Sequence, residues 1–256
     1  MKKYFYLVFV AIVAAMSITL ASCDNDDDWS NGDPSENGMK LSTLTEEDGS
    51  WSEYLYDSKG RVSQVKQYDK NGQLHFSTTV EYNANNIVVT TYSDDRLFDR
   101  DVCTLNAKGQ IIKSVCSDGG DSEYTYNDQG QMINIYFAEY DHNTTLVWEN
   151  GNLVKALYGD DAGFICEYSS IPLSKGFVIF GDDVLIDVFS DYINLPLLAN
   201  CGYFGKLPQN MLSSLTYYEG NSRQTFNYTY ELDKDGYVSN ILSDNDHWPQ
   251  CTLTWK

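Results

Sequence analysis

A tight-turn segment that recurs along the chain constrains the fold more than any other feature. In most copies an aromatic or apolar residue lies four positions before a glycine, Asp or Asn follows it at once, and an apolar residue lies two positions after the glycine. An Asp or Asn side chain can accept a hydrogen bond from the backbone two residues further on, and glycine adopts positive φ without a steric penalty. This pattern predicts β-hairpins with three-residue loops. The copies are Tyr54–Val65, Tyr82–Val88, Leu105–Ile111, Tyr124–Ile135, Leu232–Val238 and, one residue shorter, Trp148–Leu153.

The same turn geometry predicts which residues face each other across each hairpin. If Asn127 pairs with Gln131, then Tyr126 lies opposite Met132, and every other copy gains an apolar pair beside its turn. Asn86 stands where the other copies have glycine, and Asn is the next best residue for positive φ. The expected pairs are Tyr56 with Val62, Tyr82 with Val88, Leu105 with Ile111, and Leu232 with Val238.

The spacing of the turns indicates an all-β fold. The turn residues at positions 60, 86, 109, 130 and 151 lie 21 to 26 residues apart, which is about one hairpin per repeat. Residues 39–256 are therefore expected to form one domain, a single large antiparallel meander of about 14 to 16 strands. A sheet of that size is expected to be strongly curved or a partly closed barrel.

The hairpin pattern is interrupted after Ser170. A small helical insert is expected near residues 195–215, and Leu207–Leu215 fits a helical turn with Pro208 near its start. Short strands are expected at Phe177–Phe180 and Val184–Phe189, the second of which also fits a helix. This insert is expected to cover an open end or a face of the sheet.

The first 38 residues have the composition of a processing and tether segment. Residues 1–22 combine Lys2 and Lys3 with a following apolar stretch, as in a signal peptide. Residues 23–38 are rich in Asp, Asn, Ser and Gly, and such a stretch is expected to be disordered. Leu20-Ala-Ser-Cys23 resembles a bacterial lipobox, which implies lipidation of Cys23 and stable membrane anchoring. The following residues resemble the surface-export signal of Bacteroidetes-type lipoproteins, with an ordinary charged tether as the alternative: Asp24, Asn25, Asp26, Asp27 and Asp28.

The charge of the chain excludes one class of partner. The formal net charge is −20, and without residues 1–22 the chain has 15 basic and 37 acidic residues. Nucleic acid is excluded as a partner because its binding requires basic surface. The same charge argues against electrostatic docking to anionic lipid headgroups. Solubility explains the charge most simply, and calcium or a cationic ligand is the alternative.

Two family resemblances follow from these patterns. The hairpin unit resembles the YD repeats of Rhs-type and teneurin-type proteins. The whole layout resembles a family of Bacteroidetes lipoproteins of unknown function with a porin-like fold, on the lipobox, the acidic tether, the glycine-turn meander and the segment Gly202–Leu212. This resemblance implies a curved or barrel-like sheet and carries over no catalytic residue. It does not imply a pore, because the alternation gives no clean lipid-facing apolar band with aromatic girdles.

The remaining chemistry-bearing residues form no recognisable site motif. Five cysteines follow Cys23, and neither their odd number nor their spacing fits a zinc motif. The predicted register places Cys103 opposite Lys113 and Cys116 on the other face, so we expect no bond between these two and predict buried thiols. His75, His142 and His247 lie far apart and are expected to be solvated. Calcium could use the following acidic pairs, although turn chemistry also explains them: Asp160 with Asp161, Asp182 with Asp183, and Asp244 with Asp246. The other cysteines are Cys166, Cys201 and Cys251.

These observations predict a binding protein rather than an enzyme. The leading hypothesis is a non-catalytic lipoprotein, anchored in the outer membrane and exposed at the cell surface, that binds an extracellular glycan or protein. Exposed aromatic rings with Asp and Asn nearby would suit sugar stacking and hydroxyl recognition. The alternatives are a structural or assembly lipoprotein of the outer membrane, on its periplasmic face, and a glycoside hydrolase, which requires a cleft with two facing carboxylates. No catalytic residue, cofactor-binding residue or metal ligand is assigned.

Overall fold

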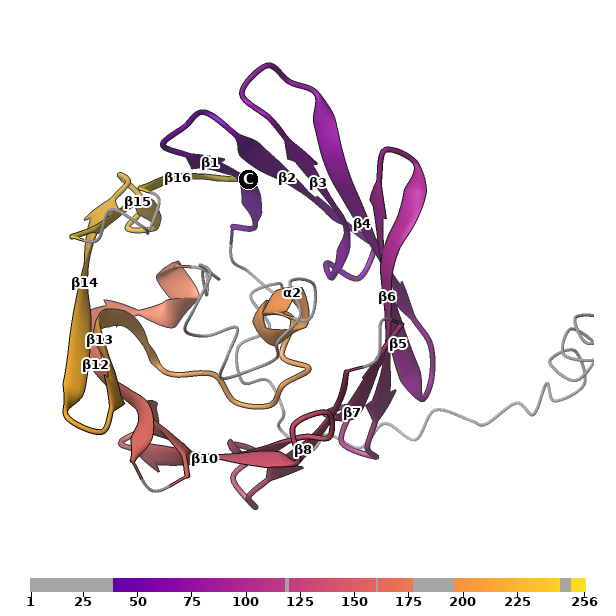
Figure 1. Ribbon diagram of the computed structural model, residues 1–256. Helices are drawn as coiled ribbons and strands as arrows, with labels where there is room; N and C mark the ends of the chain where they lie inside the picture. Colours follow the sequence, from indigo (N-terminus) through magenta and orange to yellow (C-terminus); the bar gives the residue numbers. More distant parts are fainter. Residues whose placement is uncertain (1–38, 118–119, 160, 177–195, 245–249) are drawn as a thin grey trace, which may run out of the picture. The chain divides into compact units, whose positions relative to one another are not determined.

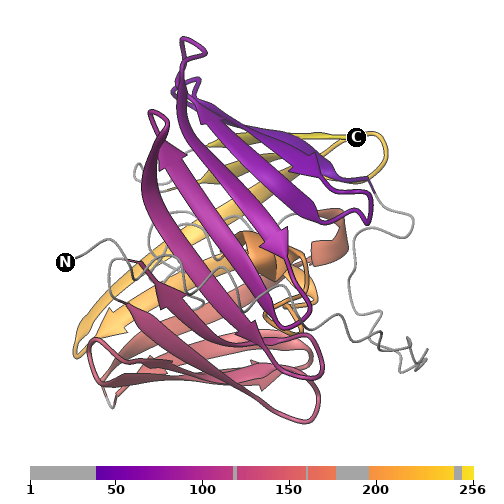
Figure 2. The ribbon, with the colours of Figure 1, turned by 90° about the vertical axis from the view of Figure 1, so that its right-hand side faces the viewer.

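The computed structural model describes residues 39–117, 120–159, 161–176, 196–244 and 250–256, and these form a closed antiparallel barrel of 16 strands. Each strand pairs with its neighbours in sequence, and β1 pairs with β16 (Figures 1 and 2). The predicted meander is confirmed, and the sheet closes fully. The strands are β1 Leu41–Glu46, β2 Trp51–Tyr56, β3 Val62–Tyr68, β4 Leu74–Tyr82, β5 Asn86–Ser93, β6 Arg96–Leu105, β7 Ile111–Cys116, β8 Asp121–Tyr126, β9 Met132–Phe137, β10 His142–Glu149, β11 Asn152–Tyr158, β12 Ala162–Pro172, β13 Asn210–Glu219, β14 Ser222–Leu232, β15 Val238–Ser243 and β16 Cys251–Trp255.

The glycine turns have the predicted geometry. In the β8–β9 turn, the Asn127 side-chain oxygen accepts hydrogen bonds from the backbone N–H groups of Gln129 and Gln131, and Gly130 has φ 79°. The turns that begin at Asp57, Asn106 and Asp233 repeat this arrangement. Four of the predicted cross-strand pairs are confirmed: Tyr126 with Met132, Tyr56 with Val62, Leu105 with Ile111, and Leu232 with Val238.

The prediction for the Asn86 copy is wrong. The backbone N–H of Asn83 donates to the carbonyl of Asn86 at 2.9 Å, which closes a two-residue turn. Tyr82 therefore faces Ile87, and Val88 lies on the opposite face of the sheet. Asn86 is not among the residues with positive φ, because a two-residue loop leaves it in the strand.

Alternation along the strands separates an apolar interior from a polar exterior. The inward positions form the core, which includes Ile87, Ile135 and Leu215. The outward positions carry charged side chains on strands all around the barrel, as the register shows: Glu53, Lys66, Glu81, Arg100, Lys113, Glu123, Lys155 and Glu167. The outer wall of the barrel therefore carries charged side chains on many of its strands.

The aromatic residue of the repeated segment links neighbouring hairpins. The Tyr126 hydroxyl donates to the carbonyl of Ile111, which lies two positions after the glycine of the preceding β6–β7 turn, at 2.6 Å. Six further aromatic side chains donate to a backbone carbonyl 15 to 18 or 20 residues earlier in the chain. They are Tyr56, Tyr82, Trp148, Tyr168, Tyr230 and Trp255, with acceptors Leu41, Val62, Met132, Leu153, Leu212 and Val238.

The segment between β12 and β13 includes η1 Leu173–Lys175 and α2 Pro196–Asn200, which lies within the ring of strands in Figure 1. Leu198, Ala199 and Phe204 are fully buried in the core. The chain then crosses the barrel end, where the N–H of Lys206 donates to the Gly130 carbonyl at 2.9 Å. The predicted insert is thus confirmed as a cover. Its helical part is shorter than expected, and the predicted helical turn over 207–215 is wrong because β13 begins at Asn210.

The two ends of the barrel differ in their turns. One end carries the turns at 57–61, 83–86, 106–110, 127–131, 150–151 and 233–237, and also the crossing segment 201–209; we call it the glycine-turn end. The other carries the turns at 46–50, 69–73, 93–96, 117–121, 138–141, 159–161 and 219–222, and also residue 244; we call it the acidic end. The signal segment, Cys23, Asp24–Asp28 and the strands predicted within 177–189 lie outside the described residues.

Candidate functional site

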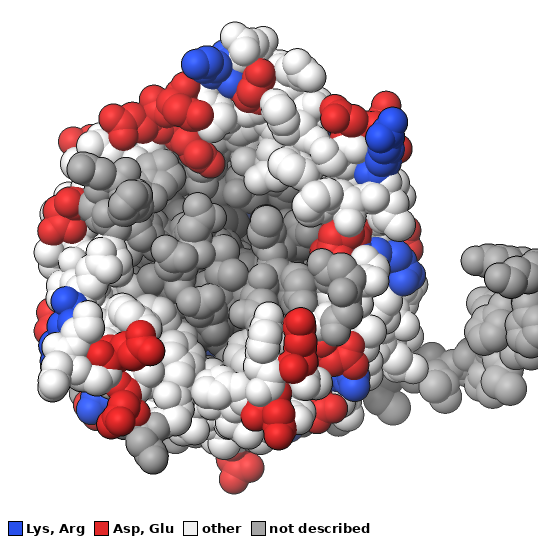
Figure 3. Space-filling view, in the orientation of Figure 1, with Lys and Arg blue, Asp and Glu red and all other residues white. Residues whose placement is uncertain are grey.

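Within the described residues, the acidic end is the more strongly charged of the two barrel ends. Among the described residues, its turns carry twelve acidic side chains and two basic ones, Lys70 and Arg96. Figure 3 shows acidic side chains around the rim of the hollowed face. The acidic residues are Glu46, Glu47, Asp48, Asp69, Asp94, Asp95, Asp121, Glu139, Asp141, Asp161, Glu219 and Asp244.

The inner face gains buried polar residues toward this end. The inward positions of the strands near the glycine-turn end are apolar or aromatic, as in the core around Ile111, Met132 and Leu153. Closer to the acidic end several buried inward residues are polar, whereas others such as Phe137 and Phe164 remain apolar. The polar residues are Ser52, Thr78, Thr91, Asp99, Asp101, Ser114, Ser122 and Thr144. Two of them, Thr78 and Thr91, are joined by a hydroxyl–hydroxyl hydrogen bond of 2.9 Å. The barrel therefore has buried polar side chains within about five residues of its acidic rim.

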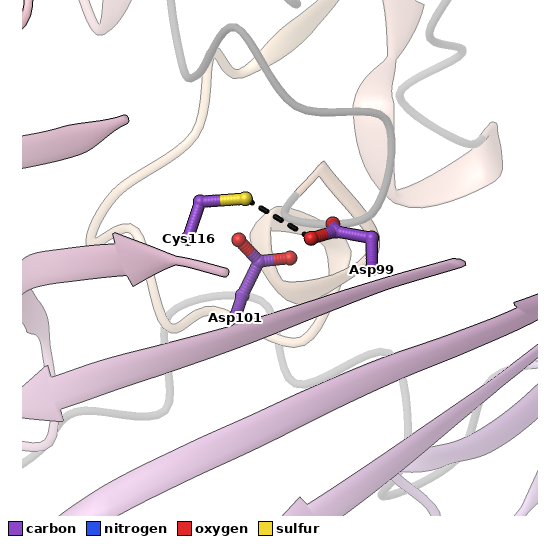
Figure 4. A group of neighbouring side chains, drawn as sticks. All are labelled: Asp99, Asp101 and Cys116. Carbon is purple, nitrogen blue, oxygen red and sulfur yellow. Dashed lines mark hydrogen bonds between the residues drawn. The ribbon is translucent and has the colours of Figure 1, made fainter. Parts of the chain in front are cut away.

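Asp99, Asp101 and Cys116 form a compact group on this polar inner face (Figure 4). Asp99 and Asp101 occupy successive inward positions of β6, and Cys116 faces Asp101 across the β6–β7 pair. The exposed fractions of the three residues are 7%, 0% and 5%. One ligand atom from each residue lies within 4.8 Å of the others.

The hydrogen bonds of Asp99 fix the geometry of this group. Its Oδ1 accepts from the Cys116 thiol at 3.0 Å, from the Ser117 hydroxyl at 3.0 Å and from the Arg100 N–H at 2.6 Å. A thiolate and two carboxylates are ligands that a zinc-type cation accepts, and three protein ligands are one fewer than a closed structural zinc site uses. These three side chains are the potential metal ligands that the described residues bring together.

A second feature lies on the two hairpins that project beyond the rim, β3–β4 and β5–β6 (Figure 2). A half-open recess of about 180 Å³ is lined by Leu74, His75, Ser77, Tyr92, Asp94 and Asp95. It is smaller than the ~300–1,000 Å³ of pockets that enclose a drug-sized molecule, so it suits one ring of a larger ligand. Asp94 and Asp95 form the turn itself and have φ 49° and 60°.

Exposed apolar and aromatic side chains surround this recess. The exposed fractions are 39% for Leu74, 39% for Tyr92 and 58% for Leu97. The register places Leu97 beside Tyr92, and Leu74 beside Tyr68. Tyr68 stacks on Trp51, with ring centroids 4.1 Å apart and planes 14° apart. These five residues form an aromatic strip across β2 to β6 on the outer face at the acidic end.

The polar groups near the recess are also ordered. His75 Nε2 lies 3.9 Å from Asp69 Oδ2. The pKa of Asp69 is held below its ordinary value, first by a backbone hydrogen bond from Gln73 and then by hydrogen bonds from Asn71. An ionised carboxylate, an imidazole and the Ser77 hydroxyl thus stand beside exposed rings, which is a combination of stacking and hydrogen-bonding groups.

The five cysteines after Cys23 are present as thiols, and all but the half-buried Cys201 are buried. Burial raises the pKa of Cys166 and Cys251 to about 12. The absence of a bond between Cys103 and Cys116 was predicted correctly from a wrong register. A bulge between Thr104 and Leu105 places Cys103 opposite Ser114, so Cys103 and Cys116 lie on the same inner face.

Of the acidic pairs predicted as possible calcium ligands, the structure describes Asp161 and Asp244. Asp244 accepts hydrogen bonds from the backbone and side-chain nitrogens of Asn227 at 2.8 and 2.6 Å, as the turn explanation expects. Asp161 lies in the β11–β12 turn, and its carbonyl accepts from Gly220. Asp160, Asp182, Asp183 and Asp246 lie outside the described residues, as does His247. The calcium prediction stays untested.

Sequence reasoning missed both features of the acidic end. Alternation from Leu105 places Cys103, Asp101 and Asp99 on one face of β6, but Cys116 joins them only through the bulge in β7. Nothing local in the sequence around Asp94 and Asp95 indicates that their hairpin projects beyond the rim.

Comparison with known proteins identifies the fold. Residues 54–240 match the model of a domain of unknown function with porin-like fold, DUF4595. A porin-like protein from Bacteroides uniformis ATCC 8492 is 20% identical over 85% of this chain and 98% of its own, with a TM-score of 0.58. One from Bacteroides vulgatus ATCC 8482 is 14% identical over 85% and 99%, with a TM-score of 0.51. No curated protein matches the chain. Within the part that the structure describes, no helix has the length and apolarity needed to cross a membrane.

Proposed function

The chain belongs to the DUF4595 family, a domain of unknown function with a porin-like fold, and from its geometry we propose a lipid-anchored binding protein that recognises a glycan at the aromatic strip and recess of the acidic end. The recess carries this proposal. Exposed rings offer faces for sugar stacking, and Asp94, Asp95, His75 and Ser77 offer hydroxyl-binding groups beside them.

The kind of membrane association is argued from the barrel wall. A porin-like fold suggests a membrane-associated protein, but a spanning barrel presents an apolar band to lipid. Here charged side chains such as Lys66, Glu81 and Lys155 face outward, and each would cost about 2–4 kcal/mol or less at a bilayer midplane, depending on charge and depth. Buried apolar side chains also pack inside the barrel, and the segment 201–209 crosses one end. These features favour an anchored barrel over a channel, with Cys23 as the proposed anchor and Asp24–Asp28 as the proposed export signal.

Catalysis is not part of the proposal. The glycoside hydrolase hypothesis requires two carboxylates that a sugar can reach. The two carboxylates of the inner-face group, Asp99 and Asp101, are 7% and 0% exposed. Neither the family description nor the described residues indicate catalysis.

The test is retention of the full chain on a panel of immobilised polysaccharides, with Cys23→Ser to keep it off membranes. We expect one glycan class to retain the protein and Tyr92→Ala to reduce its affinity at least tenfold. Tyr140→Ala is the matched control, because Tyr140 is 66% exposed in the 138–141 turn at the same end, outside the recess. The proposed site would be refuted if the Cys23→Ser protein bound no glycan, or if Tyr92→Ala and Tyr140→Ala reduced the affinity equally.

A further inference from the structure

Charge is distributed unequally between the two ends of the barrel. Among the described residues, the turns, η1 and the crossing segment of the glycine-turn end, together with residues 39, 40, 149 and 256, carry eight basic and five acidic side chains. The acidic end has the opposite balance, with two basic against twelve acidic side chains. The basic residues are Lys40, Lys59, Arg61, Lys108, Lys175, Lys206, Lys234 and Lys256, and the acidic ones are Asp57, Asp128, Glu149, Asp233 and Asp235.

The basic residues fall into two sets. Some are held against tyrosine rings: Lys175 Nζ lies 3.9 Å from the ring centre of Tyr237, and the Arg61 guanidinium lies 3.9 Å from that of Tyr82. Such contacts keep the cation at the barrel end rather than folded along the wall. Three others stand exposed at turn tips and can reach a partner directly: Lys59, Lys108 and Lys234.

The chain also enters the barrel at this end. The backbone N–H of Met39 donates to the Tyr237 hydroxyl at 3.1 Å, and Lys40 pairs with Lys256 through two backbone hydrogen bonds of 2.7 and 2.8 Å. Cys23 lies only sixteen residues before Met39. Even a fully extended chain of that length spans at most about 50–60 Å. A lipid on Cys23 therefore keeps the whole barrel within about 50–60 Å of the membrane, and the tether joins the barrel at the glycine-turn end.

We propose that the glycine-turn end docks on the anionic headgroups of the membrane that holds the Cys23 lipid, with the acidic end directed away from it. This inference rests on the proposed lipid anchor. The strongly negative total charge does not oppose it, because strands of 5 to 11 residues span about 15–35 Å and charges are screened within about 8 Å at physiological ionic strength. The aromatic strip then faces the surroundings, where a glycan is accessible.

Lysine labelling of the lipidated full chain on vesicles tests this orientation without any substitution. An amine-reactive reagent is applied to the protein on phosphatidylcholine vesicles and on vesicles that also contain phosphatidylglycerol. We expect labelling of Lys59, Lys108 and Lys234 to fall at least threefold on the anionic vesicles. Lys70, exposed in the β3–β4 turn at the acidic end, should label equally on both. Equal labelling of all four lysines on both vesicles would overturn the proposal.

Two controls separate the possible causes. Protection of the three turn lysines on both kinds of vesicle would also overturn the proposal, because protection that does not depend on lipid charge cannot come from anionic headgroups. The triple variant Lys59→Glu, Lys108→Glu and Lys234→Glu should lose the protection of Lys206 on anionic vesicles, whereas Lys66→Glu with Lys155→Glu, on the wall, should retain it. Flotation with vesicles is measured first: a chain that does not float refutes the anchor, and a floating chain with uniform labelling refutes only the docking.

Discussion

Replacing Tyr126 by Phe removes one hydroxyl from the hydrogen-bond series that links neighbouring hairpins. The hydroxyl donates to the Ile111 carbonyl at 2.6 Å, and the backbone N–H of Ile111 is itself bonded to Tyr203 in the crossing segment. A hydrogen bond of this kind contributes about 1 kcal/mol net, and a buried carbonyl left without a donor costs about 1–3 kcal/mol. We expect the free energy of unfolding to fall by about 1.5 kcal/mol.

Urea unfolding followed by tryptophan fluorescence measures this loss. With a slope of about 2–3 kcal/mol per molar urea for a chain of this size, the midpoint should fall by about 0.5–0.8 M at unchanged slope. Tyr136→Phe is the control, because the Tyr136 hydroxyl bonds to Asp141 at the exposed outer face, and its loss should cost less than about 0.5 kcal/mol. Tyr168→Phe should reproduce the Tyr126 result, since its hydroxyl donates to Leu153 at 2.7 Å. If Tyr126→Phe and Tyr136→Phe shift the midpoint equally, the aromatic series does not stabilise the barrel.

Two further predictions concern the crossing segment and alkaline pH. Gly205→Ala should destabilise the protein by at least about 2 kcal/mol more than Gly202→Ala in the same urea assay. Both glycines have φ near 80°, but only at Gly205 would the new Cβ lie 2.3 Å from the Gly130 carbonyl oxygen. Equal losses of stability would show that the crossing segment moves to relieve this clash. Burial raises the pKa of the Cys166 and Cys251 thiols from 9.0 to about 12. Their contribution to the free energy of unfolding is therefore complete below pH 9 and is lost as the pH rises toward 12. Urea midpoints should be flat up to pH 9 and fall steeply above it, and a flat profile to pH 11 would contradict the burial of these thiols.

The hairpins could be predicted from the sequence because their determinants are local. An Asx residue, a glycine and two flanking apolar residues fix the turn at Asn127, and the cross-strand pair follows from the turn alone. The same reasoning failed at Asn86, where the Asn83–Asn86 turn is shorter by one residue, because Asn is compatible with both loop lengths.

Closure and the inner-face group could not be predicted, because they depend on distant or irregular features. The β1–β16 pair joins segments that lie about 200 residues apart, and neither strand carries a local signal for its partner. The bulge at Thr104–Leu105 inverts the faces assigned to the rest of β7, so Cys116 moved from the predicted outer face to the side of Asp101. The sequence shows where the aromatic residues of the turns lie, but the carbonyl groups to which they donate belong to the preceding hairpin. Only the assembled sheet brings these carbonyl groups near.

The residues of the Asp94-Asp95 turn are less favourable for stability than Asn-Gly, and their position suits ligand binding. Two-residue turns with positive φ at both positions favour Asn-Gly, which the β10–β11 turn uses at Asn150 and Gly151. The β5–β6 turn holds two aspartates there instead, and both line the recess. Replacing the pair by Asn-Gly should remove backbone strain and like-charge repulsion. The expected gain in the free energy of unfolding is about 1 kcal/mol, which corresponds to a rise in melting temperature of about 2–4 °C. The same variant should lose glycan retention, while Tyr140→Ala keeps it. A variant that is more stable and still binds would show that the carboxylates of this turn do not contact the ligand.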